Sequence, residues 1–410
     1  MNGNIIIFED DHVDQMQPMS LTRPVFSLTC GGWTLHEMAC LAHCQVRHIV
    51  RDHVRPVSKR DYPDSTRGEG TTLFLNASLV PDVEHVRSIR ELLLEDCGKM
   101  YFAGDRLAAA ILPADRPVPT DLTADNVAQR LQKRNLPRAT DIDFATIDVP
   151  HQLVRLNREL FPSNIRRRIV QSDYPERREG VFAAPSADIA DSAVFNTTNG
   201  PVLIDEGTKV MDFVYVEGPA YIGPGSILCE RSSLKECVSI GHTCKIGGEV
   251  EVSVVEPYSN KQHHGYLGHA WIGSWVNIGA GTTNDNIDAS YGPISVEHKG
   301  GPLNSGMQFF GCLMGDLSRT AVNTSIAAGT VVGVGSRIAG YVEGHVPGFC
   351  EYAPALNRAR EVAIEDAAET QQSMFTRRDV EPTCADTDLL QNVHEMTNQE
   401  RSAFLKSPAD

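Results

Sequence analysis

The sequence contains no run of about 18 apolar residues, which is the length that a membrane-spanning helix needs. No basic segment precedes an apolar core near the start, where the longest apolar stretch is Ile5–Phe8, so we expect no secretory signal. The ten cysteines include no Cys-x-x-Cys pair, and this gives no support to zinc-ribbon or thioredoxin-type sites. We therefore expect reduced thiols and a cytoplasmic protein.

Positive charge is also scarce, because 37 Lys and Arg face 53 Asp and Glu and give a formal net charge of −16. An acidic protein repels nucleic acid and anionic membranes, so we expect neither as a partner. The composition is otherwise that of a globular protein, with 41% hydrophobic and 22% charged residues. The length of 410 residues allows about two or three domains.

Aliphatic residues recur at every sixth position in the second half of the chain. An α-helix cannot use this period, because steps of about 100° place successive members on opposite faces. A triangular coil with one strand on each side can, so we predict a parallel β-helix whose aliphatic residues point inward. The first run is Ile204, Val210, Val216, Ile222, Leu228, Leu234, Ile240, Ile246 and Val252, and the second is Met314, Thr320, Ile326, Val332 and Ile338.

This pattern resembles the hexapeptide-repeat superfamily. The resemblance implies a left-handed β-helix and a homotrimer with active sites between subunits. The period is interrupted from about Glu256 to Tyr266 and from Thr283 to Gly311, with Ile272 and Ile278 between. Because loops that leave a rigid solenoid usually carry function, we expect the site at these interruptions.

The first interruption contains Lys261, His263 and His264. Acetyl transfer to an amine needs a base, and histidine suits that role because its pKa lies near neutrality. The oxyanion that forms needs hydrogen-bond donors, and a lysine can hold a sugar phosphate. These residue types therefore favour acetyl transfer to an amino sugar phosphate.

The segment from Tyr266 to Thr282 resembles the acetyltransferase domain of the bifunctional N-acetylglucosamine-1-phosphate uridylyltransferase/glucosamine-1-phosphate N-acetyltransferase family. The resemblance implies that His263, three places before Tyr266, is the general base and that Asn277 contacts the sugar. It assigns the substrate phosphate to Lys261, although this residue lies one place closer to His263 than in the family's common pattern. The acceptor would then be glucosamine 1-phosphate.

The same resemblance implies a coenzyme site for acetyl-CoA. Ala280 matches the alanine of the family's Ile-Gly-Ala-Gly segment, which contacts acetyl-CoA. Ile326–Thr330 matches its Ile-Ala-Ala-Gly-Thr segment, which assigns Ala327 and Ala328 to coenzyme A. Plain coil packing explains these two alanines equally well.

Two alternatives stay open for the histidines. His269 stands where the family has Asp, so both His263 and His264 are candidates for the base. The second alternative is zinc, because γ-type carbonic anhydrases share this fold and bind zinc through three histidines between subunits. His264 and His269, with His242 as the third ligand, would then form the site.

Residues 1–150 lack the hexapeptide period, and strands at Ile5–Phe8 and Thr72–Leu75 with a helix in Gly32–Ala42 predict an α/β domain. Gln17–Val25 resembles the opening of bacterial sugar-nucleotidyltransferase-like proteins fused to such β-helices. The resemblance implies uridylyl transfer from UTP, which would yield UDP-N-acetylglucosamine.

Nucleotidyl transfer needs a phosphate cradle and a Mg²⁺ ion held by carboxylates. The usual Gly-x-Gly-Thr-Arg loop is absent, and Phe8–His12 takes its place. Arg23 is the candidate for a triphosphate, and Asp10 and Asp11 are the candidates for Mg²⁺. A structural ion pair at Arg23 and a non-catalytic domain remain the alternatives.

We thus predict an α/β nucleotidyltransferase-like domain over 1–150, a linker helix over 151–178, the β-helix over 179–348 and a polar tail over 349–410. The tail is expected to form an arm on a trimer surface or to be partly disordered. The predicted function is synthesis of a nucleotide sugar. An enzyme for another sugar phosphate with one inactive domain, and a non-enzymatic trimeric scaffold, are the alternatives.

Overall fold

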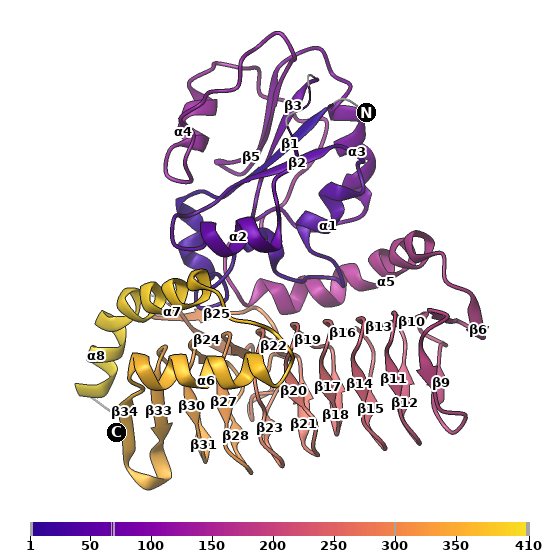
Figure 1. The fold of residues 1–410 in the computed structure, drawn as a ribbon, viewed down its shortest axis with the longest axis vertical. Helices are drawn as coiled ribbons and strands as arrows, with labels where there is room; N and C mark the ends of the chain where they lie inside the picture. Colours follow the sequence, from indigo (N-terminus) through magenta and orange to yellow (C-terminus); the bar gives the residue numbers. More distant parts are fainter. Residues whose placement is uncertain (1–2, 67, 69, 299–300, 407–410) are drawn as a thin grey trace. The chain divides into compact units, whose positions relative to one another are not determined.

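The computed structural model describes residues 3–66, 68, 70–298 and 301–406. The chain divides into two compact units, Met1–Pro150 and His151–Asp410. Each unit is described by itself below (Figure 1). In the described part of the chain, no helix is long and apolar enough to cross a bilayer.

The first unit is an α/β domain around one five-stranded sheet in the order β2-β1-β3-β5-β4. The parallel strands β1 and β3 are buried along their whole length, as their apolar sequences require, and β5 returns antiparallel to β3. The strands are β1 Asn4–Phe8, β2 Gln45–Ile49, β3 Thr72–Asn76, β4 Lys99–Ala103 and β5 Arg106–Leu112. The helices are α1 Leu35–Cys40, α2 Arg55–Asp61, α3 Glu84–Leu92 and α4 Val127–Gln132, with short 3₁₀ turns at Asp11–Met16 and Val25–Ser27.

The second unit is the parallel β-helix that the repeat predicts, preceded by helix α5 (Gln152–Ser172). We call its three sides the first, second and third face. The first face contains β6 Glu176–Arg178, β7 Val181–Ala183, β10 Val202–Ile204, β13 Ala220–Ile222, β16 Val238–Ile240, β19 Val254–Val255, β22 Trp271–Ile272, β26 Cys312–Met314, β29 Thr330–Val332 and β32 His345–Val346.

The other two faces are each built in two stretches. The second face contains β8 Asp188–Ile189, β11 Lys209–Val210, β14 Ile227–Leu228, β17 Lys245–Ile246 and β20 Asn260–Lys261, then β27 Arg319–Thr320, β30 Arg337–Ile338, β33 Cys350–Ala353 and β34 Arg358–Glu361. The third face contains β9 Val194–Asn196, β12 Tyr215–Glu217, β15 Ser233–Leu234, β18 Glu249–Glu251 and β21 Tyr266–Gly268, then β23 Thr283–Asn284, β28 Ser325–Ile326 and β31 Tyr341–Val342.

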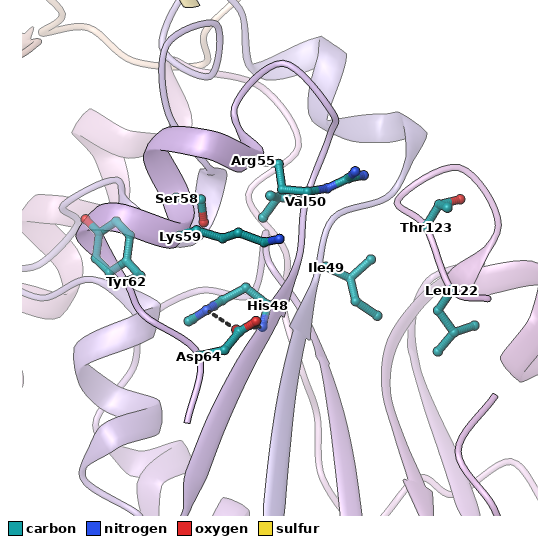
Figure 2. Close-up of a pocket in the computed structure, with 10 residues that line it drawn as sticks. All are labelled: His48, Ile49, Val50, Arg55, Ser58, Lys59, Tyr62, Asp64, Leu122 and Thr123. Atoms are coloured by element: carbon teal, nitrogen blue, oxygen red, sulfur yellow. Dashed lines mark hydrogen bonds and ion pairs between the residues drawn. The ribbon is translucent and has the colours of Figure 1, made fainter. Parts of the chain in front are cut away.

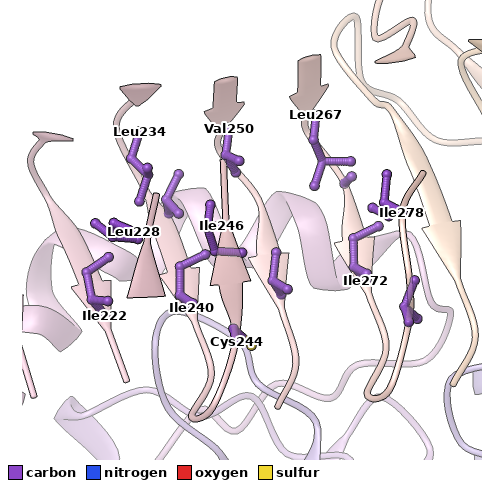
Figure 3. Packing of buried hydrophobic residues seen from close by; sticks show 14 of the residues in the cluster. Ile222, Leu228, Leu234, Ile240, Cys244, Ile246, Val250, Leu267, Ile272 and Ile278 are labelled. Carbon is purple, nitrogen blue, oxygen red and sulfur yellow. The ribbon is translucent and has the colours of Figure 1, made fainter. Parts of the chain in front are cut away.

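The predicted inward positions form one continuous core. Ile204, Ile222 and Ile240 stack in parallel register on the first face, and each is 0% exposed. Leu228 and Ile246 do the same on the second face (Figure 3). The six-residue period is therefore confirmed as the spacing of inward side chains from Ile204 to Ile246.

One predicted member of that stack is wrong. Leu234 pairs with Val250, so Val250 takes the inward position that the period assigned to Val252. Val252 instead packs outside the coil, in a cluster that includes Phe161 of α5. The corner at Gly247–Gly248 shortens the coil by two residues, and Gly248 has a φ of 71°, which glycine adopts without strain.

The first predicted interruption breaks the six-residue period but not the coil, which continues through it as β20 and β21. The register advances by 18 residues from Ile204 to Ile222 but by 15 from Ile246 to Lys261. Lys261 therefore occupies an inward position and is 1% exposed. Its Nζ donates to the carbonyls of Gly247 (2.9 Å) and His263 (3.1 Å). The apolar stem fills the core and the ammonium is satisfied at the corner.

The second interruption is real but shorter than predicted. The third face resumes at β23, and the chain then leaves the coil between Asp285 and Gly311. This excursion carries an antiparallel hairpin of β24 (Ser295–His298) and β25 (Gly301–Asn304). The side chains of Ile294 and Val296 are buried, so the excursion is a packed part of the fold and not an open loop.

Three helices lie within residues 364–406, so the expectation that the tail is partly disordered is wrong for these described residues. Helices α6 (Ile364–Thr376), α7 (Cys384–Met396) and α8 (Asn398–Lys406) follow β34 (Figure 1). On α6, Ala367, Gln371 and Phe375 are buried at a spacing of four, which gives the helix one packing stripe. The Phe375 ring lies 4.5 Å from the Trp275 ring, so α6 covers part of the second face.

The buried Lys261 has a testable consequence. Burial lowers the pKa of its ammonium to about 8, against about 10.4 in an unfolded chain. Between these values the unfolded chain binds more protons, so the free energy of unfolding rises with pH. Between pH 7 and pH 10, we expect the free energy of unfolding of the wild type to rise by about 2 kcal/mol relative to that of Lys261→Met, measured by urea unfolding. Lys245→Met, at an outward position of β17, is the control, and a constant difference for Lys261→Met would contradict the burial.

Candidate functional site

The histidines form an exposed corner between the second and third faces. His263 and His264 lie between β20 and β21, and both side chains are exposed. The Lys261 ammonium holds the His263 carbonyl, which fixes the backbone of the corner. His264 lies beside Gly281 of the next coil, because a Cβ on Gly281 would come 3.3 Å from the imidazole Nε2. The corner therefore presents two imidazoles to solvent on a rigid support.

A group of four polar side chains lies on the outer surface of the third face. The Tyr266 hydroxyl donates to Glu251 Oε2 at 2.6 Å. Asn286 Nδ2 lies 2.7 Å from the same hydroxyl oxygen and 2.9 Å from His269 Nδ1. The Phe309 ring stacks on His269 at 5.5 Å. We call Glu251, Tyr266, His269 and Asn286 the tyrosine network.

Hydrogen bonding and burial fix the protonation states in this network. Burial and the Glu251 carboxylate raise the pKa of Tyr266, so its hydroxyl keeps its proton. Burial lowers the pKa of His269 to about 4, so this imidazole is neutral at pH 7. Since the Asn286 amide donates to Nδ1, the proton of His269 is assigned to Nε2.

Asn277 lies at the centre of the second face, one strand position from the histidine corner. It bridges between Asn260 and Arg319 of the adjacent coils. Its Oδ1 accepts from Asn260 Nδ2 at 3.5 Å, and its side chain is half-buried. Asn277 and Tyr266 thus lie on the two faces that meet at His263 and His264.

The three predicted coenzyme residues are half-buried and do not lie at one corner. Ala280 lies just before the third face, and its carbonyl accepts a hydrogen bond from the backbone N–H of Asn323 at 2.7 Å. Ala327 and Ala328 follow β28, at the opposite edge of that face. A coenzyme that touched all three would have to lie along the third face.

The zinc alternative has no geometric support. The His242 imidazole lies against the Tyr258 ring at 4.7 Å, and His269 Nδ1 is already bonded to Asn286. Among the residues that the structure describes, no group of three or more His, Cys, Asp or Glu side chains could hold a metal ion. Within the single chain, His242, His264 and His269 therefore do not form a zinc site.

In the first unit, the carboxylates that follow β1 are held by arginines. Arg106 donates to both oxygens of Asp10, at 2.9 and 2.6 Å, and Asn76 Nδ2 donates to Oδ2 at 2.7 Å. Asp10 is 5% exposed, and its pKa stays low although burial alone would raise it, because Arg106 and Asn76 bond to its charged form. Asp11 is exposed. Both oxygens of Asp10 already have partners, so this geometry does not favour Asp10 as a Mg²⁺ ligand.

The arginine predicted to neutralise a triphosphate lies in the same region. Arg23 is half-buried, and its carbonyl accepts from Arg51 Nη2 at 3.2 Å. Arg51 also pairs with the buried Glu9 at 3.0 Å, and Glu9 accepts from the backbone of Val25 at 2.9 Å. Hydrogen bonds and an ion pair thus hold the loop that carries Arg23 against the end of β1. At this end of β1 the sequence has no glycine-rich loop.

A cavity of about 180 Å³ opens beyond the carboxyl end of β2 (Figure 2). Arg55 and Lys59 of α2 line it, with His48 and Asp64, whose Nδ1 and Oδ1 atoms lie 3.2 Å apart. Ligands of open α/β sheets bind beyond the carboxyl ends of strands, so this position suits a small anionic ligand. Nothing in the sequence analysis pointed to these residues.

The role of Asp10 can be tested by stability. Asp10→Ala would leave Arg106 buried with one remaining carboxylate partner, Asp148. We expect a loss of about 3 kcal/mol in the free energy of unfolding, measured by urea denaturation in metal-free buffer. Asp11→Ala, at the exposed neighbour, should change it by less than about 0.5 kcal/mol. Equal stability of Asp10→Ala and wild type would restore Asp10 as a solvated ligand.

Comparison with known proteins gives one family-model match and several similar sequences. Residues 5–168 match the model of the sugar nucleotidyl transferase family. A bifunctional sugar-1-phosphate nucleotidylyltransferase/acetyltransferase of Sulfurisphaera tokodaii is 35% identical over 172 residues, which cover 38% of this chain and 39% of that protein. The chain is related to these bifunctional transferases. The bifunctional protein GlmU of Thermosipho africanus is 32% identical over 179 residues, which cover 43% of this chain and 33% of that protein.

The matched segments span between about a third and two fifths of the length of these bifunctional relatives. Among solved structures, the Francisella novicida UDP-N-acetylglucosamine acyltransferase covers 55% of this chain and is itself covered over 78%, with 15% identity and a TM-score of 0.28. A likeness this low supports no assignment, so the relationship to the bifunctional transferases rests on the sequence matches.

The structure adds candidate site residues that the sequence analysis missed. Glu251 and Asn286 both bond to Tyr266, and His269 appeared in the sequence only as a replacement for Asp. The alternation Glu249-Val250-Glu251 would have placed Glu251 on the outer surface, had the shortened coil been recognised. Asn286 had no such signal, because it lies in the excursion.

Proposed function

We propose that the protein works in nucleotide-sugar synthesis as a bifunctional transferase. The β-helix would transfer the acetyl group of acetyl-CoA to the amine of glucosamine 1-phosphate. The first unit would transfer a uridylyl group from UTP, which gives UDP-N-acetylglucosamine. The observation that carries this proposal is the exposed histidine corner between Asn277 and the tyrosine network, in a chain related to bifunctional transferases.

The residues of the corner match the steps of acetyl transfer. The acceptor nitrogen attacks the thioester carbonyl, and His263 takes its proton as general base, with His264 as the alternative. The C–N bond forms, the C–S bond breaks, and coenzyme A leaves as a thiol after it takes up a proton. Tyr266, whose raised pKa keeps it protonated, and Asn277 supply hydrogen bonds that orient the sugar.

Lys261, which the sequence analysis assigned to the substrate phosphate, has a different role in this proposal. The Lys261 ammonium is inside the coil and donates to the carbonyls of Gly247 and His263. It therefore acts as a positioning residue that holds the His263 backbone. Ala280, Ala327 and Ala328 remain the proposed contacts of coenzyme A, along the third face.

The first unit does not fit the Mg²⁺ site predicted from the sequence. Asp10 is hydrogen-bonded to Arg106 and Asn76. Asp11 takes no part in these bonds. We therefore derive no step of uridylyl transfer through Mg²⁺ at these residues. Arg23 remains the proposed contact for the triphosphate.

A homotrimer in the cytoplasm is part of the proposal. Active sites between subunits would explain why the histidine corner is exposed in the single chain. The ten cysteines are all free, which suits a reducing compartment. Light scattering should give about three times the chain mass of 44.9 kDa.

A second candidate is an acetyltransferase whose first unit does not transfer nucleotides. The Asp10–Arg106 pair favours it, because the pair occupies the end of β1 where a phosphate cradle would lie. Incubation with acetyl-CoA, UTP, Mg²⁺ and glucosamine 1-phosphate separates the two candidates. The bifunctional enzyme yields coenzyme A and pyrophosphate, and the second candidate yields coenzyme A alone. If neither product forms, both candidates fail.

A further inference from the structure

Four arginines gather on the outer surface of the second face, where α6 ends. Arg319 of β27 and Arg337 of β30 are direct neighbours in the strand register. Arg377 and Arg378 follow α6, and Arg378 Nη2 donates to Asn260 Oδ1 at 2.6 Å on the same face. We call Arg319, Arg337, Arg377 and Arg378 the arginine cluster.

Two members of the cluster have structural partners. Arg378 bonds to Asn260, and Arg337 Nη2 donates to Thr370 Oγ1 of α6 at 3.1 Å. Glu351 is the next residue in register after Arg337, but its carboxylate is bonded to Arg358 and Arg360 of β34. These contacts fasten the end of α6 to the coil.

The other two members, Arg319 and Arg377, have no carboxylate within ion-pair distance among the residues that the structure describes. The Nε atom of Arg319 is buried and has no hydrogen-bond partner there. Burial lowers the pKa of Arg319, and the charges of Arg337 and Arg377 lower it further. Like charges around the half-buried Arg319, without a counterion, disfavour its charged form, so the cluster favours binding of an anion that offsets the repulsion.

The cluster adjoins the proposed acceptor site. Asn277 bridges to Arg319 on one side and to Asn260 on the other. Because Asn260 accepts from Arg378 through Oδ1, its Nδ2 is directed to Asn277 Oδ1. This leaves the Nδ2 of Asn277 as a donor on the outer surface. Since Lys261 is buried, Arg319 is the cation next to Asn277 in the register.

We propose that Arg319 and Arg377, with the amide of Asn277, bind a phosphate group of a substrate. A half-buried and an exposed guanidinium can hold a phosphate between them through charge-assisted hydrogen bonds. The phosphate could belong to the sugar phosphate or to coenzyme A. Only that choice of ligand rests on the proposed function, because the unpaired charges favour an anion in either case.

Thermal unfolding with inorganic phosphate tests the site without turnover. Arg319→Gln and Arg377→Gln are compared with wild type in phosphate-free buffer, then with phosphate and with chloride of equal ionic strength. Arg166→Gln is the control, because Arg166 is an exposed arginine of α5. We expect phosphate to raise the Tm of wild type and of the control, and this rise to fall by at least half in both cluster variants.

The same variants distinguish an anion site from a structural role. Without phosphate, Arg319→Gln should be as stable as wild type or more stable, because it removes unpaired repulsion. A lower Tm together with an undiminished response to phosphate would overturn the proposal and make Arg319 a structural residue.

Calorimetry identifies the source of the phosphate. Glucosamine 1-phosphate is compared with glucosamine, and coenzyme A with dephospho-coenzyme A. We expect Arg319→Gln to raise the Kd of one phosphate-bearing ligand at least tenfold and to leave its partner without that phosphate unchanged. Unchanged Kd values for both phosphate ligands would contradict the site. If phosphate binding depends on Arg319 but the protein transfers no acetyl group, the phosphate site is supported and the proposed reaction is contradicted.

Discussion

His263→Ala lowers kcat for acetyl transfer by a factor of about 10² to 10⁴, which is the usual contribution of a general base. The loss should occur without unfolding, because the side chain is exposed and has no hydrogen-bond partner in the described residues. Its free energy of unfolding should remain within about 0.5 kcal/mol of wild type. Release of coenzyme A in the presence of glucosamine 1-phosphate measures the rate.

His264→Ala is the matched control for this experiment, since the two imidazoles are adjacent and equally exposed. If His264→Ala carries the large loss instead, the base is His264, which lies beside Gly281. Nucleotidyl transfer should be unchanged in both variants, because the first unit holds none of these residues. Undiminished acetyl transfer in both variants would remove the corner from the mechanism.

Leu228→Asp is expected to cost more than about 4 kcal/mol in the free energy of unfolding, since an unpaired carboxylate would enter the core of the coil. Leu228 is 0% exposed and stacks between Val210 and Ile246. Neither neighbour can bond to a carboxylate. The loss should appear as low soluble yield and as a lower urea midpoint.

Ile227→Asp is the control, one residue earlier on the same strand. Ile227 faces outward and is flanked in register by Lys209 and Lys245, which would attract a carboxylate. This variant should be as stable as wild type within about 1 kcal/mol. Similar losses for the two variants would contradict the assignment of inward and outward positions.

The repeating part of the fold could be predicted from the sequence, because each hexapeptide places an apolar residue at the same inward position. Ile222 and Ile240 were placed correctly, since every coil around them has the same length. Lys261 was misplaced where the coils shorten, because a charged residue in a shortened coil gives no periodic signal. Only the register showed that its stem belongs to the core.

The site was predictable where residues are close in sequence and not where the fold joins distant segments. Tyr266 and Asn277 lie on one stretch of coil, and one motif predicts a role for both. Asn286 reaches Tyr266 from the excursion, and Arg377 reaches the second face from beyond α6. The pairing of Asp10 with Arg106 could not be predicted from the sequence, because the two residues are 96 positions apart.

Transfer of labelled acetyl from acetyl-CoA to glucosamine 1-phosphate by the full chain tests the central claim most directly. We expect labelled N-acetylglucosamine 1-phosphate in equal amount to the coenzyme A released, with no labelled product from glucose 1-phosphate, which lacks the amine. Release of coenzyme A that does not depend on the amino sugar, or no release at all, would contradict it.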